Sequence, residues 1–184
     1  MARSLQGHFL VASPHLPDPN FHRTVVLMVQ HDEQGALGLV LTRPTGSTIG
    51  ELWESIAKNP CNCTRVVDQG GPVRGPLMAL HTDVMCADSE VLPGVYFASR
   101  EEYLERIVQQ TEQPFRLFVG YSGWGAGQLE SELAAGGWLT TPATAEDVFS
   151  DADDLWRRIA ARIGLEILGS AVNVKHLPPD PSMN

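Results

Sequence analysis

Residues 23–30 read R-T-V-V-L-M-V-Q, and residues 36–42 read A-L-G-L-V-L-T. The first run is β-branched and apolar nearly throughout, which is typical of a strand buried on both faces. Between the two runs, residues 32–35 (D-E-Q-G) have the composition of a turn. Together these segments predict a β-hairpin near the N-terminus. Pro44 has no backbone N–H to donate to a neighbouring strand, so we expect it to end the second strand.

Helical signals follow the hairpin. Thr48 with Glu51, and Ser99 with Glu102, have the spacing of capping boxes and precede apolar residues at helical intervals. Another apolar stripe begins at Leu155, and Gly164 is expected to end that helix. A further helix is expected to begin close to residue 130. Strand-like runs lie between these helices, at residues 64–67, 77–81, 95–98 and 115–119.

The order of these elements favours an α+β fold, because strands come first and helices and strands then mix without strict alternation. A chain of 184 residues suits one domain. We therefore expect a single compact α+β domain over residues 1–176, with a mixed β-sheet, the N-terminal hairpin and about four helices. Residues 177–184 contain three prolines, and we expect them to form a mobile C-terminal tail.

The composition restricts the compartment and the partners. The formal net charge is −9, from 22 acidic and 13 basic residues, which opposes direct binding to nucleic acid. No apolar run approaches the roughly 18 residues that span a bilayer, and the first residues lack the apolar segment of a signal peptide. We therefore expect a cytoplasmic protein without membrane association.

The three cysteines agree with a reducing compartment. Cys61 and Cys63 flank one residue and Cys86 lies far downstream, which is neither a disulfide framework nor the paired spacing of a zinc site. We expect reduced thiols, no metal and no cofactor.

The most unusual segment is residues 120–130, G-Y-S-G-W-G-A-G-Q-L-E, which follows a predicted strand and precedes a predicted helix. The nucleophile elbow G-x-S-x-G fails because Trp124 stands where glycine is needed. The dinucleotide fingerprint fails on spacing and the P-loop on its missing lysine. Glu130 and Glu132 would repel a phosphate at the helix start. Two interpretations remain for the polar and aromatic side chains of this segment, a ligand pocket or packing alone.

Two other segments carry groups able to do chemistry. The proline-rich loop of residues 13–22 contains His15, Asp18 and His22, which could complete a Ser/His/Asp set with Ser122 or could belong to a rigid connection. Residues 69–73, Q-G-G-P-V, form a predicted turn before the strand that ends at His81. That histidine could carry a proton or face a ligand, or it could be structural, and the same choice holds for His31.

Taken together, these segments resemble the AlgH/YqgE family of bacterial proteins. The resemblance rests on residues 7–14 (G-H-F-L-V-A-S-P), 18–21, 35–41 with the following Arg-Pro pair, 70–73, 80–81 and 120–130, which occur in this order. Trp138 and Trp156 fit later tryptophan positions of the family, so the resemblance extends from about residue 7 to residue 164. One departure is Thr42, where the family usually has asparagine, and it puts any ligand contact by that amide in doubt.

The resemblance implies a compact cytosolic α+β protein with no established cofactor or catalytic residues. Some members of the family are described as transcriptional regulators of alginate synthesis. This sequence contains no recognisable helix-turn-helix, and its charge opposes one. Regulation through another protein or a small ligand therefore agrees better with the sequence than direct DNA binding.

Our leading hypothesis is a non-enzymatic regulatory factor that binds a small molecule or a protein, as a monomer or a homodimer. The alternative is a small hydrolase or transferase with Ser122 as nucleophile and His81 or His15 as base. The candidate pocket residues are Arg43, Gly71, Pro72, His81, Tyr121, Ser122, Trp124 and Gln128.

Overall fold

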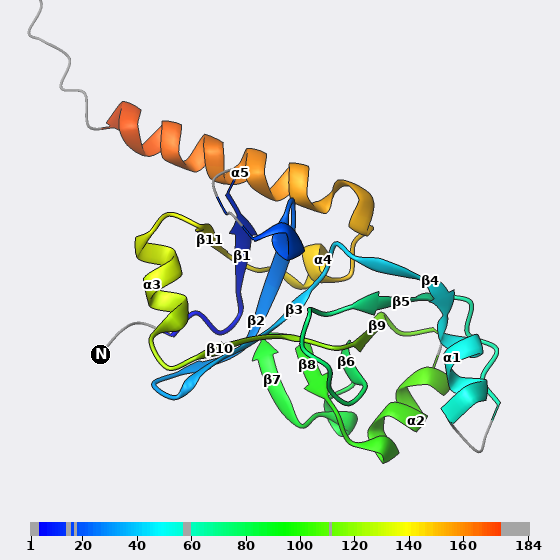
Figure 1. The fold of residues 1–184 in the computed structure, drawn as a ribbon. Helices are drawn as coiled ribbons and strands as arrows, with labels where there is room; N and C mark the ends of the chain where they lie inside the picture. The colour runs from blue at the N-terminus through cyan, green and yellow to red at the C-terminus, as the bar shows by residue number, and fades with distance from the viewer. Residues whose placement is uncertain (1–3, 14–15, 17, 57–59, 111, 174–184) are drawn as a thin grey trace, which may run out of the picture.

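The computed structural model describes residues 4–13, 16, 18–56, 60–110 and 112–173, with residues 165–173 described by their backbone alone. Within these residues the strands form two sheets (Figure 1). The first sheet is antiparallel and has the order β10 (Ser122–Gly125), β3 (Gly35–Val40), β2 (Val25–Asp32), β1 (His8–Ala12), β11 (Trp138–Pro142). The second has the order β4 (Pro44–Thr48), β5 (Val66–Gln69), β9 (Phe115–Val119), β6 (Met78–His81), β8 (Val95–Ala98), β7 (Ser89–Leu92).

The predicted hairpin is confirmed as β2 and β3. The turn between them is closed by the Asp32 carboxylate, which accepts a hydrogen bond of 2.8 Å from the Gln34 backbone. Val25 and Leu27 point into the core between the two sheets, whereas Val26 and Met28 pack on the opposite face. The β2 run is therefore buried on both faces, which explains why it is apolar at nearly every position.

Helices cover both outer faces of the two-sheet core. The outer face of the second sheet packs against α1 (Ile49–Ile56) and α2 (Glu101–Gln109). The outer face of the first sheet packs against α3 (Gln128–Ala134) and the 3₁₀ turn η1 (Pro19–Phe21). A second 3₁₀ turn, η2 (Val84–Cys86), precedes β7.

Two helices follow β11. The short α4 (Ala145–Val148) leads into the long α5 (Ala152–Asn173), which lies beside β1 and β11 in Figure 1. Leu155, Ile159 and Ile163 of α5 enter the core between the sheets. No helix of the described residues has both the length and the apolar character needed to cross a membrane.

The α+β class is confirmed, but the architecture is richer than predicted. The described residues form two sheets instead of one, and only the β5–β9 pair is parallel. They contain five α-helices instead of about four. The additional helix is α4, which is too short to show an apolar periodicity in the sequence. The domain boundary at residue 176 and the tail of residues 177–184 lie outside the described residues.

The local predictions had mixed outcomes. The Thr48–Glu51 capping box is confirmed, since each backbone N–H donates to the other side chain, at 2.8 and 3.3 Å. The second box is wrong: Arg100 occupies the N-cap position of α2 without a capping bond from its side chain, and the Ser99 hydroxyl donates to Asp88.

Of two predicted element ends, one is wrong and one is confirmed. Gly164 does not end α5, because one glycine costs a helix only about 1 kcal/mol and good helix formers follow it. The second strand does end before Pro44, since β3 stops at Val40, and Pro44 then begins the edge strand β4, where its missing N–H is tolerated.

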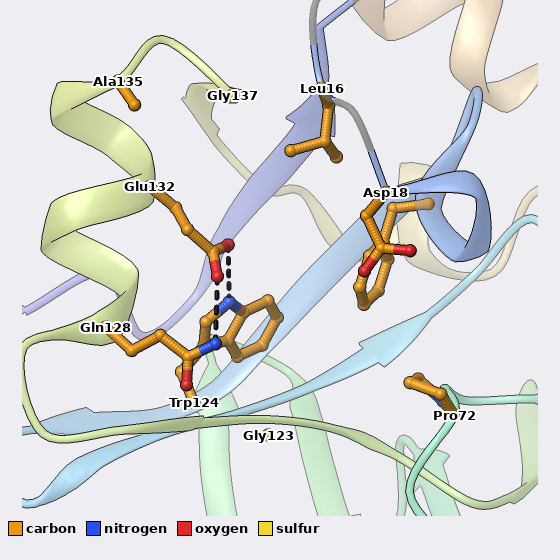
Figure 2. Close-up of a pocket in the computed structure, with 10 residues that line it drawn as sticks. Leu16, Asp18, Pro72, Gly123, Trp124, Gln128, Glu132, Ala135 and Gly137 are labelled. Carbon is orange, nitrogen blue, oxygen red and sulfur yellow. Dashed lines mark hydrogen bonds between the residues drawn. The ribbon is translucent and has the colours of Figure 1, made fainter.

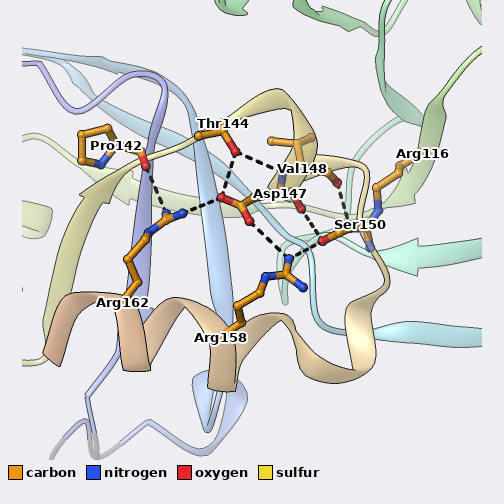
Figure 3. A network of polar contacts seen from close by, with 8 residues as sticks. All are labelled: Arg116, Pro142, Thr144, Asp147, Val148, Ser150, Arg158 and Arg162. Carbon is orange, nitrogen blue, oxygen red and sulfur yellow. Dashed lines mark hydrogen bonds and ion pairs between the residues drawn. The ribbon is translucent and has the colours of Figure 1, made fainter. Parts of the chain in front are cut away.

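A polar network fixes α5 against α4 (Figure 3). The Asp147 carboxylate receives hydrogen bonds from Thr144 at 2.8 Å, Arg162 at 2.7 Å and Arg158 at 3.2 Å. Burial raises the pKa of Asp147, but the bonds from Arg162, Thr144 and Arg158 outweigh it and hold the pKa below its ordinary 3.8. The carboxylate therefore stabilises the fold while it is ionised.

Replacing Asp147 with asparagine is expected to lower the free energy of unfolding by about 2 kcal/mol at pH 7, because two arginines lose their charged partner. A lowered folded pKa gives stability that is present above the unfolded pKa and is lost as the pH falls through the folded pKa. The two proteins should therefore converge in stability below pH 3.8, in urea titrations followed by circular dichroism. A difference that stays constant down to pH 2 would contradict this account.

Candidate functional site

A hollow of about 410 Å³ lies between α3, β10 and the segment that leads into β2 (Figure 2). Its walls come from three places that are far apart in the sequence. The described lining residues are Leu16, Asp18, Phe21, Pro72, Gly123, Trp124, Gln128, Glu132, Ala135 and Gly137. A volume of this size suits a small organic molecule.

One side of the hollow is aromatic. The ring of Phe21 stacks beside that of Trp124 with centroids 6.2 Å apart, and it meets Trp138 edge-on at 5.2 Å. The two indoles also lie edge to face, 6.1 Å apart. These rings belong to the small core under α3, so the wall is held rigidly by packing.

Glu132 organises the polar side of the hollow. Its Oε2 accepts hydrogen bonds from the indole N–H of Trp124 at 3.0 Å and of Trp138 at 2.8 Å. Its Oε1 accepts from the amide of Gln128 at 3.0 Å, one helical turn earlier in α3. All of these donors are neutral, so none of them cancels the negative charge of Glu132.

The electrostatics of the hollow are one-sided. Asp18 supplies a second carboxylate, which also caps η1 by accepting from the Asn20 backbone at 2.9 Å. None of the described lining residues is Lys, Arg or His. The walls therefore attract a cation or a hydrogen-bond donor and repel phosphates and carboxylates.

Glycines allow the backbone to bring these walls together. The sequence S-G-W-G of β10 pairs with β3, and a Cβ on Gly35 would collide with the Trp124 carbonyl. Gly127 then turns the chain at φ = 73° and starts α3, so that the helix folds back over the sheet. Leu129 is buried on the inner face of α3, which leaves Gln128 and Glu132 facing the hollow.

The predicted pocket residues are divided by the fold. Pro72, Trp124 and Gln128 line the hollow together. Arg43 and Gly71 line a smaller neighbouring hollow of about 230 Å³, which shares Pro72 with the first. Tyr121 is partly buried and packs against the core between the sheets.

Ser122 and His81 lie apart from the hollow. Ser122 is fully buried in β10, and its hydroxyl donates to the Gly70 carbonyl at 3.2 Å. His81 is buried in β6 of the second sheet, and in the described structure neither ring nitrogen makes a hydrogen bond of good geometry. Burial lowers the pKa of His81, although Asp83 and Asp88 oppose this. The two side chains therefore do not form a nucleophile–base pair, and His15 lies outside the described residues.

Sequence reasoning missed most of the hollow. Leu16, Phe21 and Gly137 come from loops and strand starts whose packing is long-range. Glu132 did carry a signal, because it stands four residues after Gln128 and so shares its helix face. Thr42, at the position of the family's usual asparagine, accepts a hydrogen bond of 3.2 Å from the Val25 backbone and so helps to hold the hairpin.

The cysteines lie elsewhere, in the core under α1 and α2. All three are buried and free, and burial raises the pKa of Cys61 and of Cys86, which keeps these two thiols protonated. In the described part of the chain, no group of three or more His, Cys, Asp or Glu side chains is placed to hold a metal ion.

Comparison with known proteins gives the family. The model of a family described as AlgH-like matches residues 9–168. The chain belongs to the AlgH-like family. A UPF0301 protein of Streptomyces coelicolor is 36% identical, over 98% of this chain and 96% of its own length. A UPF0301 protein of Pseudomonas aeruginosa is 38% identical, over 89% of this chain and 90% of its own.

Solved structures agree with this assignment. The solution structure of the AlgH protein from Pseudomonas aeruginosa has a TM-score of 0.73 and 35% identity, and the match covers 97% of this chain and 100% of that one. A crystal structure of a protein from Corynebacterium diphtheriae has a TM-score of 0.71 at 22% identity, covering 88% of each chain, which shows a common fold. The predicted resemblance to the AlgH-like family is therefore confirmed.

Proposed function

We propose that this AlgH-like chain is a non-enzymatic binding protein whose hollow under α3 takes a small molecule with an apolar body and a cationic end. The observation that carries the proposal is Glu132, a carboxylate that points into the hollow and has only neutral described partners (Figure 2). Asp18 adds a second negative charge on the same walls. A cation bound there would be attracted by both carboxylates.

The aromatic wall supports the same ligand class. The faces of Trp and Phe rings attract cations, and quaternary ammonium groups are held in this way by aromatic cages. Trp124 and Phe21 both line the hollow, and leucine and alanine side chains provide apolar contacts for the rest of the molecule.

Binding without turnover agrees with the chemistry of the lining. None of the described lining residues is Ser, Thr, Cys, His or Lys, so the carboxylates of Asp18 and Glu132 are the groups there able to act as nucleophile or base. Both oxygens of Glu132 already accept hydrogen bonds from neighbouring side chains, which favours a structural and binding role for it. We place this function in the cytoplasm, because the three cysteines are buried as free thiols. We further propose that any regulatory effect passes to another protein, since a net charge of −9 opposes contact with DNA.

The test compares choline with its uncharged isostere 3,3-dimethyl-1-butanol, by calorimetry and tryptophan fluorescence. Choline should bind saturably at one site and about tenfold more tightly than the isostere, because only choline gains from the carboxylates and the ring faces. Glu132→Gln should lose most of this preference, since its amide oxygen can still accept from both indoles but carries no charge, while Asp18 and the ring faces remain.

Glu54→Gln, an exposed change on α1, is the matched control and should bind choline like the unaltered protein. Equal affinity for choline and the isostere would contradict a charge-selective hollow, and so would a complete lack of response to choline.

A further inference from the structure

A second hollow, of about 370 Å³, lies on another part of the surface, where the end of the hairpin meets the start of α5. It is built from Arg23, two residues before β2, from the segment between β3 and β4, and from the first two turns of α5. Its described lining residues are Arg23, Thr42, Arg43, Pro44, Ala152, Asp153, Trp156 and Arg157.

The charge of this hollow is opposite to that of the protein as a whole. Three guanidinium groups stand on its walls with one carboxylate, that of Asp153, in a chain whose net charge is −9. Arg157 also pairs with Asp154 at 2.9 Å, and both of these side chains are largely exposed. The positive charge that remains uncompensated therefore comes mainly from Arg23 and Arg43.

Neither of those two arginines pairs with a carboxylate within the described residues. The Arg43 guanidinium donates to the His22 carbonyl, which fixes its position without neutralising it. The Arg23 guanidinium lies 5.6 Å from the centroid of the Trp156 ring, in a cation–π contact that also leaves its charge intact. Two oriented guanidinium groups thus line one hollow, and among the described residues neither is paired with its one lining carboxylate, that of Asp153.

The backbone at Arg23 gives an independent indication. Arg23 has φ = 53°, and among the described residues it is the one non-glycine residue with a positive φ. This conformation is strained for a residue with a Cβ and is free of strain for glycine. An arginine that occupies a backbone position where glycine would be free of strain points to a role for its side chain.

We propose that this arginine-lined hollow binds the phosphate group of a small phosphorylated molecule. Guanidinium groups form two parallel hydrogen bonds to phosphate oxygens, and the bonds are strengthened by charge. The indole of Trp156 lies beside the guanidinium of Arg23, so a ring attached to the phosphate can pack on the same wall. This site is distinct from the acidic hollow under α3 in position and in sign of charge, and it stands independently of the function proposed for that hollow.

The experiment titrates the full chain with inorganic phosphate, phenyl phosphate and phenol, by calorimetry and by the fluorescence of its tryptophans. Phenyl phosphate is expected to bind saturably at one site, more tightly than inorganic phosphate, and phenol is expected not to bind. No saturable binding of phenyl phosphate would overturn the proposal. Equal affinities for phenyl phosphate and inorganic phosphate would overturn the contact with Trp156.

Arg23→Gly is the decisive variant, because it removes the guanidinium and relieves the strained backbone. Phenyl phosphate should bind about tenfold more weakly to it, while its melting temperature should not fall. Arg74→Gly removes the same charge from an exposed position in another loop and should bind like the unaltered protein. Equal weakening in both variants would show a general effect of net charge and overturn the site, as would unchanged affinity in Arg23→Gly.

Discussion

Replacing Arg116 with alanine should lower the free energy of unfolding by about 3–5 kcal/mol at neutral pH, because the change leaves a buried carboxylate without its partner. The Arg116 guanidinium contacts Asp68 at 2.8–2.9 Å, and these side chains are 11% and 7% exposed. It also donates to the Leu41 carbonyl at 2.6 Å and to the Val148 carbonyl at 3.2 Å. One side chain therefore joins β5 and β9 of the second sheet to the residue that follows β3 and to α4.

The pH dependence of the unfolding free energy of Arg116→Ala distinguishes an unpaired buried charge from lost packing. Burial already raises the pKa of Asp68, and Arg116 opposes that rise. Without Arg116 the pKa of Asp68 in the folded protein should rise further above its unfolded value of 3.8. The variant should therefore lose stability as the pH increases from 3.8 through the folded pKa of Asp68. The deficit against the unaltered protein should thus be larger at pH 7 than at pH 4, in urea titrations.

Two further variants of this chain make the test specific. Adding Asp68→Asn to Arg116→Ala should restore part of the stability at pH 7, because the buried group is then neutral. Arg157→Ala breaks an exposed pair with Asp154 and should change stability very little. If adding Asp68→Asn made the Arg116→Ala protein still less stable at pH 7, the unpaired Asp68 carboxylate would not be the cause of the lost stability.

The outcome of sequence reasoning depended on how local each signal was. The β2–β3 hairpin could be predicted because its strands are β-branched or apolar runs joined by a turn that its own residues close. The Thr48 box could be predicted for the same reason. In contrast, β10 reads S-G-W-G, which has no strand pattern. It is a strand only because it pairs with β3, and so its own residues could not predict it. Ser99 failed as a cap because α2 begins one residue later, with Arg100 at its N-cap position, and the Ser99 hydroxyl donates to Asp88 eleven residues earlier.

The candidate site shows the same limit. Trp124 and Gln128 could be singled out because they belong to one unusual segment, but Phe21 reaches the hollow from a turn about a hundred residues earlier in the chain. The sequence also suggests Arg43 and His81 as residues of the same pocket, but the fold places Arg43 at other hollows and His81 in the second sheet. Spacing in the sequence identifies reactive side chains, whereas the pairing of strands decides which of them meet.

Glu132→Ala is expected to lower the free energy of unfolding by about 2–6 kcal/mol, because it leaves two buried indole N–H groups without an acceptor, at about 1–3 kcal/mol each. Trp124 and Trp138 are 6% and 3% exposed, so water cannot easily replace the lost acceptor. Both indoles donate to the same oxygen, Oε2, and one change therefore removes both bonds. Guanidinium chloride titration followed by far-ultraviolet circular dichroism measures the loss without relying on tryptophan emission.

Glu132→Gln separates the acceptor from the charge. Its amide oxygen can take both indole bonds, although neutral hydrogen bonds are weaker than charged ones, so we expect it to lose less than half as much stability as Glu132→Ala. The exposed Glu54→Ala on α1 should lose little. If Glu132→Gln proved as unstable as Glu132→Ala, the indoles would need the full carboxylate, and the charge of Glu132 would serve the aromatic core instead of a cationic ligand. A stable Glu132→Gln that no longer prefers choline would leave that charge available for the ligand.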